Sequence, residues 1–129
     1  MLGTFQSSDL RIEVEASELL IRDALLRPAY LRQWLWFQKF PETISDPLKV
    51  GEVFTTWLGP VSIQHQVVEV GRNSLKMSLS KGIDGYHHWC WGDGWVQSSL
   101  EGISLLPLNL GQTLSLMQLR SFLHQQRSR

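Results

Sequence analysis

The 129-residue sequence has little of what would direct a chain to an oxidising compartment or to nucleic acid. Cys90 is its only cysteine, so an intramolecular disulfide cannot form. Twelve basic and twelve acidic residues cancel, so no overall charge attracts nucleic acid or an anionic membrane. Residues 1–6 lack the basic start and apolar run of a secretory signal, and we therefore expect a cytoplasmic protein.

A long uninterrupted hydrophobic run is also missing. The most leucine-rich stretch, residues 103–123, contains Pro107 and several polar residues, which makes it a poor candidate for spanning about 30 Å of hydrocarbon. We expect no membrane insertion. Hydrophobic residues make up 43% and charged residues 19% of the chain, a composition typical of globular proteins. The length is that of one domain, and no repeat or low-complexity segment divides it.

The first third of the chain predicts a strand followed by two short helices. Apolar and polar residues alternate from Leu10 to Ala16, which indicates a strand with one buried face. Ser17 is suited to cap a helix, which Pro28 ends or resets. Because proline is favoured in the first turn of a helix, a second helix is expected from Pro28 to Leu35.

The rest of the chain predicts an antiparallel meander and a final helix. Glycine-rich turns separate five segments of β-type composition, which are residues 52–58, 61–70, 74–80, 86–91 and 95 to about 104. Pro107 ends the last strand, and a helix is expected from about Asn109 to Gln126.

This order of elements resembles that of the START/SRPBCC superfamily, which includes polyketide cyclases and birch-pollen-allergen-like proteins. Trp34 follows the break at Pro28, and residues 49–54 look like the family's entry into its second strand. Residues 82–86 and 105–114 are similar to a short bacterial branch. The resemblance covers residues 1–129 and implies one α+β helix-grip domain, in which a curved antiparallel sheet wraps around the long C-terminal helix and leaves a cavity.

The C-terminal helix is apolar on two sides. At 100° per residue it carries two leucine-rich ridges on roughly opposite faces. The first ridge is formed by Leu110, Leu114 and Met117, and the second by Leu116, Leu119 and Leu123. Either one packs on the sheet and the other on the short helices or the closed end of the pocket, or one of them lines an open ligand cavity or a partner interface.

The strand at residues 86–91 has two faces of different chemistry. His87, Trp89 and Trp91 project to one side, and Tyr86, His88 and Cys90 to the other. If the second set faces the core, two tryptophans are exposed and suggest self-association or docking. If the first set faces inward, the pocket is aromatic and could stack on a planar ligand. The sequence leaves both open.

The chain offers weak candidates for a metal or a cofactor. Adjacent histidines on a strand point to opposite faces, so only His88 and Cys90 could cooperate on a zinc ion, with His65 as a distant third ligand. The surroundings of Cys90 are not electropositive enough for a reactive thiolate. The glycines at 92 and 94 read as a hairpin turn rather than a phosphate loop. We expect no metal and no cofactor.

The leading hypothesis is a non-enzymatic module that binds a small lipophilic or aromatic molecule between the sheet and the last helix. Its apolar walls are expected from Trp34, Phe54, Trp57, Ile63, Leu114 and Met117. A polar group of the ligand would be fixed by His65, Tyr86, His88 or Arg120.

Two alternatives stand beside it. A polyketide cyclase or aromatase-like enzyme would need a proton donor or acceptor and a group that steadies an enolate. Candidates for these roles are His65, Tyr86, His88, Glu101 and Arg120. A protein-interaction domain or homodimer would use exposed Trp89 and Trp91, or the second apolar side of the last helix.

Overall fold

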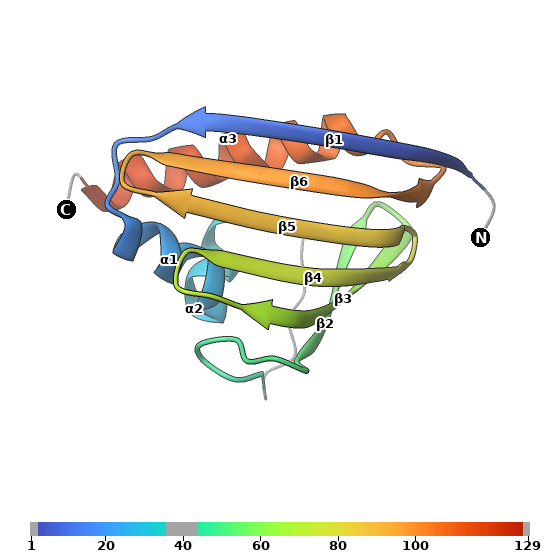
Figure 1. Ribbon diagram of the computed structural model, residues 1–129, viewed down its shortest axis with the longest axis horizontal. Coiled ribbons are helices and arrows are strands. Elements are labelled where there is room, and N and C mark those ends of the chain that lie inside the picture. Colours follow the sequence, from blue (N-terminus) through green and yellow to red (C-terminus); the bar gives the residue numbers. More distant parts are fainter. Residues whose placement is uncertain (1–2, 36–43, 128–129) are drawn as a thin grey trace.

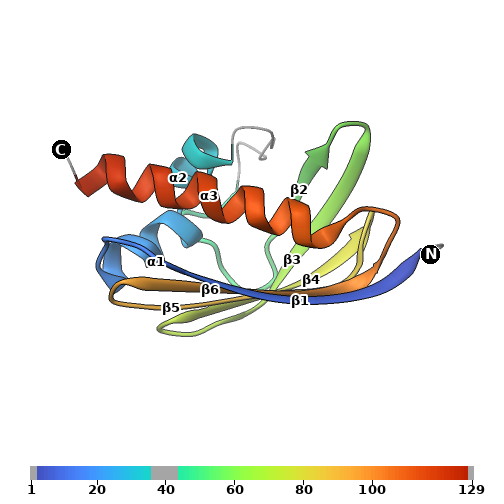
Figure 2. The same ribbon diagram turned by 90° about the horizontal axis from the view of Figure 1, so that it is seen from above.

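The computed structural model describes residues 3–35 and 44–127, and this part of the chain forms one antiparallel sheet with three helices on a single face (Figures 1 and 2). The strand order is β1-β6-β5-β4-β3-β2. The strands are β1 (Thr4–Glu13), β2 (Val53–Leu58), β3 (Val61–Val70), β4 (Ser74–Lys81), β5 (Asp84–Gly92) and β6 (Trp95–Ser104). The predicted meander, its turns and its order are confirmed, and the architecture is the α+β helix-grip fold.

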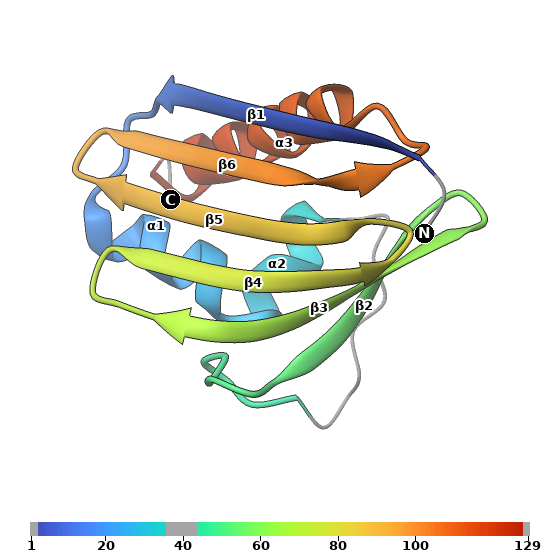
Figure 3. The same ribbon diagram turned by 45° about the vertical axis from the view of Figure 1, so that its right-hand side comes forward.

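The two short helices form as local sequence rules require. α1 (Glu18–Leu26) begins after Ser17, whose hydroxyl accepts a hydrogen bond from the backbone N–H of Leu20 at 3.2 Å. α2 (Pro28–Trp34) has proline in its first turn, where a missing N–H costs nothing. The indole Nε1 of Trp34 donates to the carbonyl of Ala24 at 2.8 Å and ties the two helices together. Both helices lie on the same side of the sheet as the C-terminal helix (Figure 3).

The first strand begins at Thr4, six residues before the predicted start. Residues 4–9 contain Gln6 and four further polar side chains, so they show no simple apolar alternation. Their place is set by β6, because β1 pairs with it antiparallel over its whole length, from Thr4 opposite Ser104 to Glu13 opposite Trp95. The chain's first strand therefore lies beside its last.

The C-terminal helix α3 (Leu108–Arg127) presents one of its ridges to the core. Leu116, Leu119 and Leu123 are buried, and α3 contacts β1, β6, α1 and α2. The other ridge faces outward: Leu110, Leu114 and Met117 are 57%, 50% and 63% exposed. The outward ridge packs neither on the short helices nor on the end of a pocket.

The strand β5 turns its aromatic set inward. Trp89 and Trp91 are buried in the core, whereas Tyr86, on the other face, is 47% exposed. Trp89 meets Trp34 of α2 edge-on, with ring centroids 6.4 Å apart. The sequence left the choice of face open, and the packing of α2 against β5 decides it. The prediction of an interaction surface that uses exposed Trp89 and Trp91 is therefore wrong, because both side chains are buried.

Candidate functional site

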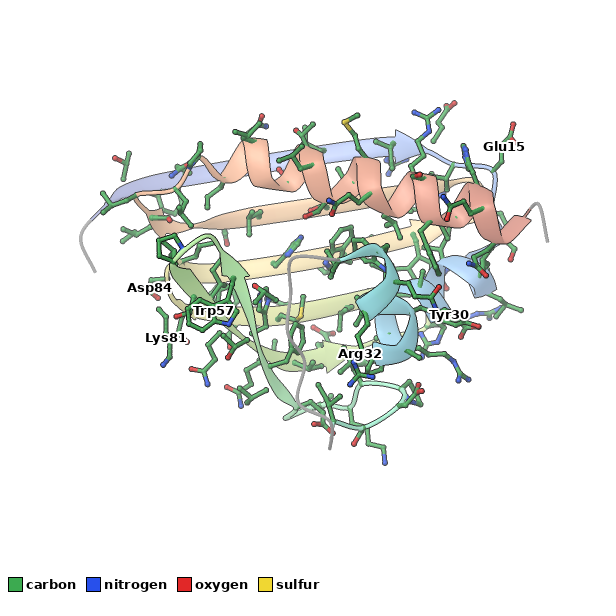
Figure 4. The ribbon with its side chains drawn as sticks, turned by 180° about the vertical axis from the view of Figure 1, so that it is seen from behind. Glu15, Tyr30, Arg32, Trp57, Lys81 and Asp84 are labelled. Atoms are coloured by element: carbon green, nitrogen blue, oxygen red, sulfur yellow. The ribbon has the colours of Figure 1, made fainter. Side chains whose placement is uncertain are left out.

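A cavity of about 110 Å³ lies between the concave face of the sheet, α2 and the first turns of α3. Its wall is mostly apolar and includes Leu31, Trp34, Phe54, Met77 and Trp89. Five polar side chains interrupt this surface: Thr56, His65, His87, Gln112 and Ser115. No aspartate, glutamate, lysine or arginine is among the lining residues in the described part of the chain. Figure 4 shows this side of the molecule, with the helices in front of the sheet.

Gln112 of α3 provides the first polar point of the cavity. It is 3% exposed, and its Nε2 lies 2.8 Å from the carbonyl oxygen of Ser98 and 3.1 Å from that of Ser8. These contacts hold α3 against β6 and β1 at one end of the cavity. Its Oε1 is buried and has no hydrogen-bond partner among the described residues.

Ser98 connects this glutamine to a histidine on the neighbouring strand. The Ser98 hydroxyl accepts a hydrogen bond from Gln112 Nε2 at 3.0 Å and lies 2.8 Å from Nε2 of His87. A serine hydroxyl donates one hydrogen bond and accepts up to two, so Ser98 can donate to His87 Nε2 or accept from it, depending on the tautomer of the ring.

His65 of β3 provides the second polar point. Its Nε2 lies 2.8 Å from the hydroxyl of Thr56, and its ring stacks on Phe54, with centroids 4.7 Å apart and planes 6° apart. Both partners come from β2, which pairs with β3. The Nδ1 atom of His65 is buried without a partner among the described residues.

Both cavity histidines are neutral at physiological pH. Burial lowers the pKa of His65 from 6.5 to about 3. Burial, together with the nearby His65 and His88, lowers the pKa of His87 from 6.5 to about 3. The cavity is therefore uncharged as well as largely apolar.

Four of the predicted ligand-contacting residues line the cavity. Trp34, Phe54, Ile63 and His65 converge on it from α2, β2 and β3. Whether they contact a ligand stays a prediction, but the structure places them together around one space.

The other six predicted residues lie outside the cavity wall. Tyr86 and His88 are on the convex face of β5, opposite to His87, and Trp57 is 41% exposed on β2 (Figure 4). Leu114, Met117 and Arg120 are on exposed positions of α3. Their placement corrects the sequence prediction, because alternation along a strand and rotation along a helix turn them away from the sheet's concave side.

Among the cavity residues that the sequence analysis missed are His87 and Gln112. His87 shares a face with Trp89, so it would have been found had the face of β5 been known. Gln112 is spaced by four residues from Leu108 and from Leu116, both of them buried. A glutamine at helical spacing between buried leucines was the signal that could have identified it.

The two side chains considered for a metal site, His88 and Cys90, share the convex face of β5. The thiol of Cys90 lies 3.5 Å from Nε2 of His88, and no third ligand joins them, since the described residues contain no group of three metal-ligating side chains. Burial raises the pKa of Cys90, against a smaller lowering by Arg11. The cysteine is therefore held as a thiol.

The sequence matches no protein-family model, and no curated protein is significantly similar to it. Solved structures are similar in fold. A point mutant of norcoclaurine synthase from Thalictrum flavum, in complex with a transition-state analogue, superposes with a TM-score of 0.66 at 16% identity, over 98% of this chain and 99% of that one.

Two further solved structures have a similar fold. DynU16, encoded in the dynemicin biosynthetic locus, gives a TM-score of 0.67 at 17% identity, over 92% of this chain and 47% of the other. The Aha1 dimer from Colwellia psychrerythraea gives 0.65 at 15% identity, over 92% and 96%. The fold is thus of the START/SRPBCC type, as the resemblance in sequence implied. Within the described residues, no helix has the length and apolarity needed to cross a membrane.

Proposed function

We propose that this protein is a binding module for a small, uncharged, lipophilic or aromatic molecule held in the cavity between the sheet and α3. The observation that carries the proposal is a cavity of about 110 Å³ whose wall, among the described residues, is mostly apolar, with a few polar and no charged side chains. A concave, mostly apolar surface with a few polar side chains is the usual form of a small-molecule site. Similarity in fold to norcoclaurine synthase, which was solved in complex with a transition-state analogue, supports small-molecule binding by this fold.

The chemistry of the wall selects against ions. A charged ligand would lose its hydration without meeting an opposite charge, because the lining residues carry none and both histidines are neutral. The size of the cavity sets a second limit. At about 110 Å³ it is somewhat smaller than a cavity of about 150 Å³ that admits benzene. The volume therefore limits the ligand to one ring at most.

Binding is favoured over catalysis of the cyclase type. A general base works best with a pKa near the operating pH, whereas His65 and His87 have a pKa of about 3. Tyr86, His88, Glu101 and Arg120 do not line the cavity. The set of groups that an aromatase-like enzyme would need does not converge.

The proposal is tested by native mass spectrometry of protein purified from its own source and by titration with toluene as a probe. We expect a co-purifying small molecule and saturable toluene binding by NMR. Ser115→Trp places a large side chain at the cavity wall and should abolish toluene binding. Ser121→Trp, on an exposed position of the same helix, is the matched control and should retain it. Equal binding by both variants would show that the probe sits elsewhere.

A second candidate, self-association, rests on the outward ridge of α3. Leu110, Leu114 and Met117 lie about one turn apart and are all at least half exposed. A second copy of the chain is the proposed occupant, since the similar Aha1 structure is a dimer. Light scattering tests it: a dimer that Leu114→Lys converts to a monomer supports this candidate, and a monomeric parent protein contradicts it.

A further inference from the structure

Gly111 of α3 is the one glycine of this chain that neither backbone geometry nor packing requires. All ten glycines lie in the described part of the chain. Each of the others either has a positive φ or would carry a Cβ atom less than 3.0 Å from a neighbouring heavy atom. Gly111 has an ordinary helical backbone, and a Cβ atom there would meet no heavy atom within 4 Å beyond its own helical turn.

A glycine at this position weakens the helix. Glycine is the least favourable helix residue after proline, and it gives the unfolded chain extra freedom that folding must remove. An alanine would fit without a clash and would favour the helix. What glycine provides here is therefore the empty space beside α3.

That space lies on the cavity side of the helix. Gly111 lines the cavity, and so do Leu108 and Ser115, three residues before it and four residues after it. Residues at these spacings share one face of a helix, so a side chain at position 111 would point to the same side as theirs. Gly111 and Ser115 are half-buried, which leaves the space beside them accessible to a molecule in the cavity.

The surroundings of this space are aliphatic. Leu108 belongs to a cluster of buried side chains that also line the cavity, together with Ile63, Leu79, Ile83 and Leu100. A polar group placed against such a surface loses its hydration without gaining a partner, whereas a hydrocarbon group gains by leaving water. An apolar part of a ligand is therefore what this end of the cavity accepts.

We infer that Gly111 is a specificity-determining residue, and that the ligand places an apolar group in the space that a side chain at this position would fill. This rests on the proposed function. It adds which part of the ligand lies against α3 and which residue limits the ligand's size. In a cavity of about 110 Å³, one methyl group at position 111 removes room that a substituent on a ring needs.

The experiment compares benzene and toluene by NMR titration of the full chain, in the parent protein and in Gly111→Ala. The two probes differ by one methyl group, and the substitution adds one methyl group to the cavity wall. Because one methyl group in a hydrophobic pocket changes affinity by about tenfold or more, Gly111→Ala should weaken toluene binding by about tenfold. Benzene binding should weaken less.

Stability measurements separate this effect from damage to the fold. Without a probe, Gly111→Ala should raise the urea midpoint, because alanine favours the helix and clashes with nothing. Ser121→Ala, on an exposed position of α3, is the matched control: it also favours the helix and should bind both probes as the parent does. The expected variant is thus more stable than the parent and binds toluene less tightly.

Four results would contradict the inference. Unchanged toluene binding by Gly111→Ala would show that the ligand does not reach this space, and equal weakening of both probes would show that position 111 does not select by size. A lowered urea midpoint of the probe-free variant would show that the space is not open. In these three cases the binding module would stand without this determinant, whereas failure of both probes to bind the folded parent protein would overturn the module itself.

Discussion

At the scale of single residues, the two buried neutral histidines make the free energy of unfolding depend on pH. In the unfolded chain both take up protons as the pH falls below about 6.5. In the folded protein their pKa values of about 3 keep them neutral, so protons favour the unfolded state between these limits. We expect the free energy of unfolding to fall by up to about 1.4 kcal/mol per pH unit for each histidine, and urea titrations at pH 7, 6 and 5 measure it.

The variant His65→Leu removes one of the two groups and should remove its share of this slope. Relative to the parent protein, it gains about 2 kcal/mol between pH 6.5 and pH 5. His88→Gln, on the convex face of β5, keeps both buried histidines and should therefore keep the full dependence. An unchanged slope in His65→Leu would contradict the assignment of a buried neutral histidine at this position.

At the scale of elements, substitutions in α3 test whether only one of its two ridges is buried. Leu119→Ala removes a fully buried side chain between helix and sheet and should cost about 2–5 kcal/mol. Leu114→Ala changes a side chain that is 50% exposed on the outward ridge and should cost about 0.5 kcal/mol or less. Urea denaturation of the two variants gives the comparison, and equal losses would show that the outward ridge is covered in solution.

The elements themselves could be predicted because their signals are local. Ser17, Pro28 and Pro107 punctuate the chain, and the predicted ends of β2 to β6 and α3 lie within about two residues of the observed ones. The start of β1 was missed because residues around Gln6 are polar and owe their strand to pairing with β6. Local rules contain no information on such a partner 100 residues away.

The faces of the elements were less predictable than their ends. Both sides of β5 carry aromatic residues, so alternation gave two acceptable choices, and only the contact of Trp89 with Trp34 separates them. On α3 both ridges are apolar, so hydrophobicity alone could not distinguish the exposed Leu114 and Met117 from the buried Leu116. Residues placed on the wrong face account for all six misassigned wall positions, namely Trp57, Tyr86, His88, Leu114, Met117 and Arg120.

At the scale of the whole molecule, the pairing of β1 with β6 predicts cooperative unfolding. The strand nearest the N-terminus and the strand just before α3 share one edge of the sheet, and α3 packs on both. The main core cluster joins side chains from α1, α2, α3 and the sheet, so no large segment keeps its core when another unfolds. We expect a single domain with one unfolding transition.

Two spectroscopic probes test this. Circular dichroism at 222 nm follows the helices, and the near-ultraviolet signal is dominated by tryptophans, among them Trp89 and Trp91 in the sheet. Their urea midpoints should coincide in the parent protein. Leu25→Ala, which truncates a buried side chain of α1, should lower both midpoints equally, although no tryptophan lies in that helix. If only the helical signal moved, the helices and the sheet would be separate folding units, and the cavity between them would open without global unfolding.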